Sequence, residues 1–466
     1  MFDTIIIGGG PAGYLAAERL GRGKKNVLLI ERSHIGGTCL NAGCIPTKTL
    51  LNCAKKYVHA KEAGKFGVKT ENVTFDWTAI QNWKNEVTLK LRGGIEQKMK
   101  RCGVQVINAA GEILASSSGE KPAKVKSISS DGEEIIHECK TILVCPGSAP
   151  VMPPIPGAKD NPFIADSSSL LAAEAVPKKL AVIGGGVIGV EFAELFSAFG
   201  CEVTIIEMTD EIIPFMDSEL SPILRKAMQN VNFKLGCKVE KIDGSAVYYI
   251  AKNNKTEELK ADLILMAAGR GPATDTWGAK AAGIDVTRNG VNTDDFMRTN
   301  IPRIWAAGDV TGKSLLAHSA YRMGEVAAAD ITAVLDNHTN NKTNSMRYNA
   351  IPWAVYGITE AAGVGITEQE ASSKGIKILK ASLPKRFSGR FTAENSFNAP
   401  GAVKVIADAK NKRILGIHAV GSYASEFIWG GAALIEQEFR LDDVKQLIFP
   451  HPTVCELIRD AVWEIE

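Results

Sequence analysis

The sequence predicts an α/β protein built from two similar βαβ units and a separate carboxyl-terminal α+β domain. The segment Ile5–Gly13 is echoed by Ala181–Gly189, and in both an apolar run leads into the pattern Gly-x-Gly-x-x-Gly. A second apolar run follows each loop and ends in an acid, Glu31 or Glu207, 23 residues after the first glycine. No such loop occurs after about residue 347, where β segments are followed by amphipathic helices.

Length and composition exclude several classes of protein. The chain has 466 residues, enough for three or four domains at about 100–200 residues each. It has 54 Lys and Arg against 52 Asp and Glu, which argues against nucleic acid or an anionic membrane as the main partner. The longest apolar stretch, 180–200, contains two glutamates and five glycines, so no membrane span is expected. No signal peptide is recognisable, and a cytoplasmic location is predicted.

The two glycine loops have the spacing that a dinucleotide requires. The first glycine permits a tight turn, the second lets the backbone approach a pyrophosphate, and the third lets the helix pack against the strand. The helix N-terminus then faces the phosphates, and the acid accepts hydrogen bonds from a ribose. One such loop is weak evidence, whereas two in the same context predict two bound dinucleotides that exchange electrons. The glycines are Gly8, Gly10 and Gly13 in the first loop and Gly184, Gly186 and Gly189 in the second.

A cysteine pair follows the first acid. The segment Gly36–Lys48 holds Cys39 and Cys44 in a Cys-x4-Cys pattern, one pair among nine cysteines. A zinc half-site is one alternative, but no second Cys/His pair stands at ligand spacing, so no metal site is predicted. Two core cysteines are the other alternative, although the surrounding glycines and polar residues would make a poor core. A helix is expected to begin near Cys44 with Pro46 in its first turn, which would stabilise a Cys44 thiolate.

The carboxyl terminus holds a histidine framed by prolines, in the segment Phe449–Glu456. A lone histidine is more often structural than catalytic, but the flanking prolines fix the backbone and favour a functional His451. Glu456 has two interpretations. It could orient the histidine, or it could close a Thr-x-x-Glu capping box at the start of the last helix.

The Gly36–Lys48 segment, the two glycine loops and the His-Pro segment together resemble the pyridine nucleotide–disulfide oxidoreductases over essentially the whole chain. The resemblance implies two Rossmann-like dinucleotide-binding domains, the first for FAD and the second for NAD, and a dimerisation domain. It implies that Cys44 lies beside the flavin, that Cys39 exchanges with the substrate, and that Lys48 pairs with Glu191 near the flavin. A solvated helix residue is the alternative for Glu191.

Further roles come from the same resemblance. His451 would act as acid and base in the partner subunit's active site, with Glu456 orienting it. Further cofactor-binding residues would be Glu31, Thr38, Lys48, Gly147 and Asp309 for the flavin nucleotide, and Glu207 and Gly269 for the nicotinamide nucleotide.

The resemblance also implies a domain division and a reaction. The FAD domain would be 1–149, the NAD domain 150–270, a central domain completing the FAD site 271–346, and the dimerisation domain 347–466. A homodimer would oxidise a protein-bound dihydrolipoyl arm to its disulfide and pass the hydride to NAD⁺. The partner would be a lipoyl-bearing acyltransferase subunit of a 2-oxoacid dehydrogenase complex, or the lipoyl carrier protein of glycine cleavage.

Two alternative functions stay open. A glutathione or mercuric reductase would use NADPH, but the segment Glu207–Glu211 has no Arg or Lys for a 2′-phosphate, and no cysteine pair ends the chain. A nucleotide-binding subunit without activity is disfavoured because both cysteines, Lys48 and His451 occur together. The chain departs from the family at Phe449-Pro450 and at Cys455, where His-Ala and Ser are common, which leaves the substrate preference open.

Overall fold

The computed structural model describes residues 1–116, 121–338 and 345–465. These residues form two compact units, each assembled from three separate stretches of chain. The first unit comprises Met1–Thr49, Gln81–Val151 and Gly269–Arg347; the second comprises Leu50–Ile80, Met152–Ala268 and Tyr348–Glu466. Most of the polar stretch 337–344, which the sequence places before the last domain, lies outside the described residues.

The first unit is built on a mixed sheet with strand order β3-β2-β1-β6-β5-β4, and β19 pairs with β6. The pairs among β3, β2, β1, β6 and β19 are parallel, whereas β5 and β4 run antiparallel. Strands β1 and β2 are almost wholly buried, as expected for parallel strands covered on both faces. The strands are β1 (Phe2–Ile7), β2 (Val27–Glu31), β3 (Gln105–Asn108), β4 (Ala110–Ala115), β5 (Ala123–Ile128), β6 (Glu134–Val144) and β19 (Ile304–Ala306).

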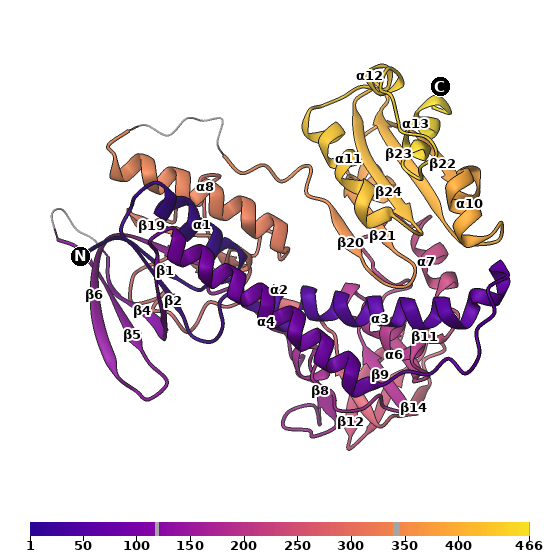
Figure 1. The fold of residues 1–466 in the computed structure, drawn as a ribbon, viewed down its shortest axis with the longest axis horizontal. Helices are drawn as coiled ribbons and strands as arrows, with labels where there is room; N and C mark the ends of the chain where they lie inside the picture. Colours follow the sequence, from indigo (N-terminus) through magenta and orange to yellow (C-terminus); the bar gives the residue numbers. More distant parts are fainter. Residues whose placement is uncertain (117–120, 339–344, 466) are drawn as a thin grey trace. The chain divides into compact units, whose positions relative to one another are not determined.

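Helices α1 (Pro11–Arg22) and α8 (Ala317–Leu335) pack side by side in this unit (Figure 1). They approach closely because Gly324 has no side chain: a Cβ there would lie 2.4 Å from the Ala12 carbonyl oxygen. Other elements of this unit are α2 (Gly37–Ala42), β7 (Ser148–Pro150), β16 (Arg270–Pro272), β17 (Val286–Thr287) and β18 (Gly290–Val291). Helices α3 (Cys44–Glu62) and α4 (Trp77–Arg101) are divided between the two units, with 44–49 and 81–101 in the first and the rest in the second.

The second unit contains the second glycine loop and a parallel sheet with strand order β11-β10-β9-β15-β8. An antiparallel sheet, β12-β13-β14, accompanies it. The strands are β8 (Ile164–Ala165), β9 (Lys179–Ile183), β10 (Glu202–Glu207), β11 (Val231–Leu235), β12 (Lys238–Asp243), β13 (Ala246–Ile250), β14 (Thr256–Lys260) and β15 (Leu263–Met266), with helices α5 (Ser167–Leu170), α6 (Val187–Ala198) and α7 (Ser221–Ala227).

The carboxyl-terminal part of the second unit is an antiparallel sheet, β20-β21-β24-β23-β22, against which α11 and α13 pack. This confirms the β segments that the sequence predicts after about residue 347. The elements are β20 (Trp353–Val355), β21 (Ala361–Gly365), β22 (Ile378–Pro384), β23 (Ala402–Asp408), β24 (Ile414–Val420), α9 (Glu368–Ser373), α10 (Gly389–Asn395), α11 (Ala424–Glu436), α12 (Leu441–Lys445) and α13 (Glu456–Trp463).

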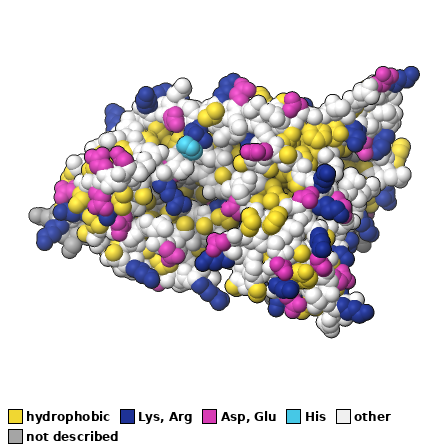
Figure 2. Space-filling model, turned by 90° about the horizontal axis from the view of Figure 1, so that it is seen from below, with side chains coloured by type: hydrophobic (Ala, Val, Ile, Leu, Met, Phe, Trp, Pro, Cys, Tyr) yellow, Lys and Arg dark blue, Asp and Glu magenta, His cyan; other side chains and the backbone are white. Residues whose placement is uncertain are grey.

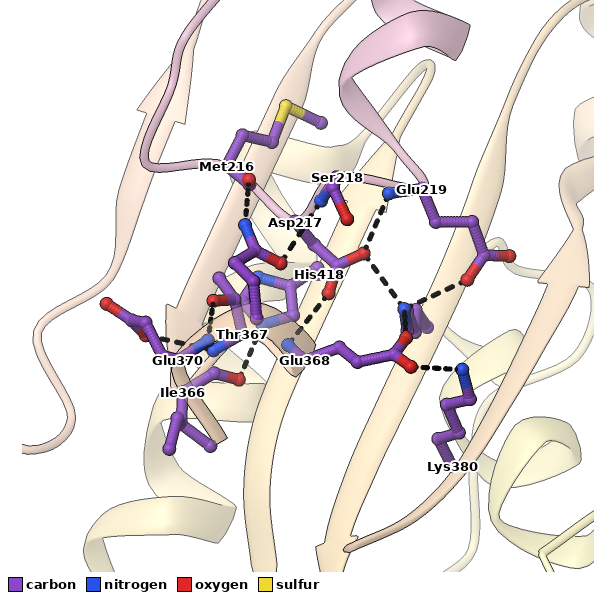
Figure 3. A network of polar contacts seen from close by, with 12 residues as sticks. Met216, Asp217, Ser218, Glu219, Ile366, Thr367, Glu368, Glu370, Lys380 and His418 are labelled. Carbon is purple, nitrogen blue, oxygen red and sulfur yellow. Dashed lines mark hydrogen bonds and ion pairs between the residues drawn. The ribbon is translucent and has the colours of Figure 1, made fainter. Parts of the chain in front are cut away.

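A buried ionic cluster ties this sheet to the segment that follows β10 (Figure 3). Lys404 of β23 is fully buried and donates to Asp217 at 2.9 Å and to Glu368 at 2.6 Å. Glu219 lies 2.9 Å from the same ammonium group, and Asp217 is itself fully buried. Nearby on β24, His418 is buried, and its Nε2 lies 2.9 Å from the Ile366 carbonyl oxygen. The cluster therefore connects the part of the unit that holds the second glycine loop with its carboxyl-terminal sheet.

Charged side chains of both signs are interspersed over the face drawn in Figure 2, in keeping with the net charge of +2. Within the described ranges, no helix is long and apolar enough to span a bilayer.

Candidate active site

The first glycine loop joins β1 to α1 and leaves space for a dinucleotide. Gly8 has a φ of +103°, and a Cβ there would lie 2.2 Å from the Cys145 carbonyl oxygen. A Cβ at Gly13 would lie 1.9 Å from the Gly8 carbonyl oxygen, so the helix packs against the loop only because that atom is absent. At Gly10 the nearest neighbour of a Cβ would be 3.8 Å away. Among the described residues no side chain caps α1, so its first amides can bind phosphate oxygens.

The second loop, between β9 and α6, repeats this geometry. Gly184 has a φ of +108°, and a Cβ at Gly189 would lie 2.0 Å from the Gly184 carbonyl oxygen. At Gly186 no atom of the described chain lies within 4 Å of where a Cβ would stand. The open space at the second glycine of each loop is where a pyrophosphate would approach the backbone. The two loops therefore fit two dinucleotides.

The acid at the end of each second strand is anchored to its own glycine loop. Glu31 Oε2 accepts the Gly9 amide at 2.7 Å, and Glu207 Oε2 accepts the Gly185 amide at 2.6 Å. Glu207 Oε1 also accepts the amide and the hydroxyl of Thr209, at 2.7 and 2.8 Å. A carboxylate oxygen has two lone pairs, so each anchored acid can still accept a ribose hydroxyl.

Asp309 starts a 3-10 turn after β19, in the same unit as the first loop. Ser148 donates to its Oδ2 at 2.6 Å, and Arg270 donates to the Ser148 hydroxyl at 2.9 Å and to the Ser148 carbonyl at 2.6 Å. Burial raises the pKa of the Asp309 carboxyl, against the opposing effects of Ser148 and Arg270. Gly147 and Gly269 both have positive φ, +80° and +102°, with open space in the described structure where a Cβ would lie. The sequence gives no local signal for the Ser148–Arg270 link.

The cysteine-bearing segment begins against the first glycine loop. The Gly36 amide donates to the Gly9 carbonyl at 2.8 Å, and a Cβ at Gly37 would lie 2.6 Å from the Gly10 Cα atom. Cys39 lies in α2, next to the exposed Thr38. Cys44 is the first residue of α3, which confirms the predicted helix start. Both cysteines are therefore positioned by the loop that would hold the first dinucleotide.

The two thiols contact each other. Both are half-buried thiols, and their side chains are hydrogen-bonded. That hydrogen bond, followed by burial, raises the pKa of the Cys39 thiol, whereas the charge of Lys48 one turn along α3 acts in the opposite direction. Thiols that share a hydrogen bond are close enough to be joined by oxidation. The pair can therefore alternate between dithiol and disulfide.

A tyrosine pair near the thiols was not identified from the sequence. The hydroxyls of Tyr14 in α1 and Tyr321 in α8 are hydrogen-bonded to each other. Burial, followed by this bond, raises the pKa of Tyr14, and the nearby Cys39 acts on both phenols in the same direction. The two residues are 307 positions apart, so only the packing of α1 on α8 brings them together.

Glu191 is 3% exposed on α6, so the interpretation as a solvated helix residue is wrong. Its Oε1 accepts the Tyr356 amide at 3.0 Å. Lys48 belongs to the first unit and Glu191 to the second, so their pairing stays a prediction.

The carboxyl-terminal histidine forms a dyad with Glu456. His451 Nδ1 lies 3.0 and 3.2 Å from the two carboxylate oxygens, and Glu456 Oε2 also accepts the Thr453 amide at 2.8 Å. The last helix begins at Glu456 itself with Cys455 as N-cap and no side-chain cap, so the predicted capping box is wrong and only its bond from the Thr453 amide to Glu456 is formed. The contact with His451 fits the orienting role, which stays a prediction. Burial alone would raise the pKa of this carboxyl, but the Thr453 and His451 hydrogen bonds and the Arg459 charge hold it below its usual value. Because Nδ1 is engaged, Nε2 is the nitrogen left to exchange a proton with a substrate.

The fold and these groups define a class of protein: a redox enzyme with two dinucleotide sites, a thiol pair against the first of them and a histidine–carboxylate dyad near the carboxyl terminus. Comparison with known families agrees. Residues 2–324 match the model of the pyridine nucleotide-disulphide oxidoreductases, and residues 351–462 match the dimerisation domain of the same family.

The chain is 33% identical to dihydrolipoyl dehydrogenase of Geobacillus stearothermophilus, over 98% of this chain and 95% of that protein. It is 37% identical to dihydrolipoamide dehydrogenase of Chaetomium thermophilum, over 98% and 90% of the two chains. Among solved structures, the HOCl-induced flavoprotein disulfide reductase RclA of Escherichia coli matches with a TM-score of 0.84 and 29% identity, over 99% of both chains.

The chain belongs to the pyridine nucleotide-disulphide oxidoreductases and carries the dimerisation domain of that family. It is an oxidoreductase that uses FAD and NAD(H), and its fold class is the predicted one.

Proposed function

We propose that this chain is a dihydrolipoyl dehydrogenase, which oxidises a protein-bound dihydrolipoyl dithiol to the disulfide and reduces NAD⁺ to NADH. The observation that carries the proposal is the hydrogen-bonded Cys39–Cys44 pair at the edge of the first glycine loop. The full-length similarity to enzymes named for this activity supports the substrate assignment.

The thiol pair carries out the exchange with substrate. In the oxidised enzyme, a substrate thiolate attacks Cys39 Sγ, the Cys39–Cys44 bond breaks, and Cys44 leaves as a thiolate. The second substrate thiolate then attacks the substrate sulfur of the mixed disulfide, which releases Cys39 and the oxidised substrate. The N-terminus of α3 and the charge of Lys48 stabilise the Cys44 thiolate. FAD, held by the first loop, would supply the two-electron acceptor that links the Cys39–Cys44 dithiol to NAD⁺.

The histidine–carboxylate dyad accepts and releases the proton of the substrate thiol. His451 Nε2 takes the proton of the substrate thiol, and the anchored Glu456 carboxylate at Nδ1 holds the ring and stabilises its protonated form. The His451 side chain is 79% exposed in the single chain, as a group that serves a second chain would be. We assign the dyad to the active site of the partner subunit in a homodimer, a proposal that the dimerisation domain supports.

The remaining assignments follow from the two loops. The flavin nucleotide would be held by the first loop with Glu31, Thr38, Lys48, Gly147 and Asp309, and the nicotinamide nucleotide by the second loop with Glu207 and Gly269. Glu191 would pair with Lys48. The domain limits at 149, 270 and 346 belong to the same proposal, as do a lipoyl-bearing acyltransferase or carrier protein as partner and a cytoplasmic location.

An anaerobic titration tests the proposed function. Dihydrolipoamide and, separately, NADH should each bleach the flavin absorbance of the purified holoenzyme, and lipoamide should restore it after NADH. A Cys39→Ser variant is the matched control: NADH should still bleach it, while dihydrolipoamide should not. If NADH bleaches the wild-type enzyme and dihydrolipoamide does not, the substrate is another disulfide and the proposed activity is wrong.

A further inference from the structure

A second carboxyl, Glu194, lies one helical turn from Glu191 on α6. Glu194 is 3% exposed, and its Oε2 has no hydrogen-bond partner among the described residues. Its Oε1 receives a long hydrogen bond, 3.4 Å, from the Thr359 amide. A Cβ at position 357 would lie 1.4 Å from Oε2, so Gly357 leaves the space that this oxygen occupies. The sequence shows Glu194 only as an interruption of an apolar stretch.

One short loop, between β20 and β21, donates hydrogen bonds to both the Glu191 and the Glu194 carboxyl. The Tyr356 amide donates to Glu191 at 3.0 Å, and the Thr359 amide donates to Glu194 at 3.4 Å. Glu191 therefore has the stronger donor of the two. Two buried carboxylates so close together repel each other, and a single proton goes to the one whose charge is less well stabilised.

The only cation that acts on Glu194 in the described structure does not neutralise it. Lys55 of α3 is near enough to attract the Glu194 charge, but its ammonium group donates to Glu360 at 3.1 Å. Glu360 in turn accepts the Ser425 amide and hydroxyl at 3.2 and 2.8 Å. The Lys55 ammonium group therefore donates to another carboxyl, and within the described structure no charged group donates a hydrogen bond to Glu194.

We propose that Glu194 is a positioning residue that holds a proton at neutral pH and so places no second negative charge beside Glu191. Burial raises the pKa of Glu194 to about 8; the Thr359 amide and the Lys55 charge oppose the shift, and the Glu191 charge adds to it. In the neutral range Glu194 is therefore protonated and uncharged. Above about pH 8 its negative charge appears, one turn from Glu191. The proposal rests on the assignment of Glu191 to the active site.

Infrared spectroscopy of the holoenzyme tests where the proton lies. The C=O stretch of a protonated carboxyl is separate from the carboxylate bands, so the difference between wild type and Glu194→Gln at pH 7 should contain one such band. Titration of the wild type should remove that band between about pH 7 and pH 9. Glu202→Gln, at an exposed acid on the neighbouring strand, is the matched control and should leave the band in place. The wild-type titration needs no variant, so poor folding of Glu194→Gln would not prevent the test.

The effect of the Glu194 charge on the site of Glu191 is tested by a second measurement, the rate of flavin reduction. The rate at which NADH bleaches the flavin should fall in the wild type as pH rises through about 8, because the second negative charge opposes transfer of a hydride to a nearby acceptor. Glu194→Gln should lack this step, so that its rate does not change between about pH 7 and pH 9. A purely structural role would change the rate at every pH alike.

Two results would overturn the proposal: no protonated-carboxyl band at pH 7, or a pH step near 8 that is unchanged in Glu194→Gln. Failure of the proposed function is distinguishable from these. In that case dihydrolipoamide would leave the flavin oxidised, while the infrared band and the pH step with NADH would both remain.

Discussion

Replacing Lys404 by Met should destabilise the second unit strongly, because the fully buried Asp217 would lose its counter-ion. Removing one partner of a buried ion pair typically costs about 3–5 kcal/mol. Glu368 and Glu219 also contact Lys404, but their side chains are 36% and 46% exposed, so water compensates most of what they lose. The loss therefore comes mainly from Asp217, which keeps only the Glu219 and Glu368 amides as donors, both at 3.1 Å.

The reverse replacement should be milder. In Asp217→Asn, Lys404 keeps both exposed carboxylates, so the cost should be that of one charged hydrogen bond, about 1.5–3 kcal/mol. The double variant Lys404→Met/Asp217→Asn should recover most of the loss of Lys404→Met, because no buried charge is left unpaired.

Amide hydrogen exchange of the intact holoenzyme measures these losses of stability separately for each helix and strand. It is preferred to global unfolding because so large a chain does not unfold in a single two-state step. At 1.36 kcal/mol per factor of ten, exchange at β23 and α9 should accelerate by about 10²·²–10³·⁷ in Lys404→Met. Equal effects of Lys404→Met and Asp217→Asn, or a double variant no better than Lys404→Met, would refute the reasoning.

The same cluster sets the acid limit of stability. Burial alone would raise the pKa of Asp217, but the Lys404 hydrogen bond and the backbone amides outweigh it, so the folded pKa lies below the ordinary value of 3.8. The stabilisation is then complete above about pH 4–5 and is lost as pH falls through the folded pKa. The wild type should lose exchange protection at β23 below about pH 4, and the double variant should lose less.

Three further predictions concern the site. The kcat/KM for NADH should exceed that for NADPH by at least about tenfold. Hydrogen bonds from the ribose hydroxyls to the charged Glu207 carboxylate contribute about 1.5–3 kcal/mol, and the same carboxylate repels a 2′-phosphate. Equal kcat/KM values for the two nucleotides would contradict this. Cys39→Ser should keep a long-wavelength absorbance band from the Cys44 thiolate beside oxidised flavin, whereas Cys44→Ser should lose this band. A band that is present only in Cys44→Ser would show that Cys39, and not Cys44, lies beside the flavin. His451→Gln should slow dithiol oxidation about 10²–10⁴-fold, but it should not slow bleaching of the flavin by NADH. When His451→Gln chains are mixed with Cys44→Ser chains, a mixed dimer has one intact site if the base comes from the partner. Its activity should then rise towards half that of a wild-type dimer. Mixed dimers that form and stay inactive would show that the base is not supplied by the partner.

The sequence by itself determined the features that depend on neighbouring residues. The tight turns at Gly8 and Gly184 need a positive φ that glycine adopts freely, so the motif alone predicts their geometry. The start of α3 at Cys44 follows likewise from local preferences. The reach of Glu456 to the Thr453 amide follows from a separation of three residues.

Only the tertiary structure decided the contacts between distant parts of the chain. Lys404 and Asp217 are 187 residues apart, and nothing near either residue in the sequence indicates that they form one buried pair. In the sequence, Glu194 is only an acidic residue within an apolar helix. The structure shows in addition that the loop containing Gly357 packs against its carboxyl. Such contacts depend on which elements pack together and in what register. Burial then determines the charge state of these groups, because the cost of a charge depends on all the atoms around it and not on its neighbours in the chain.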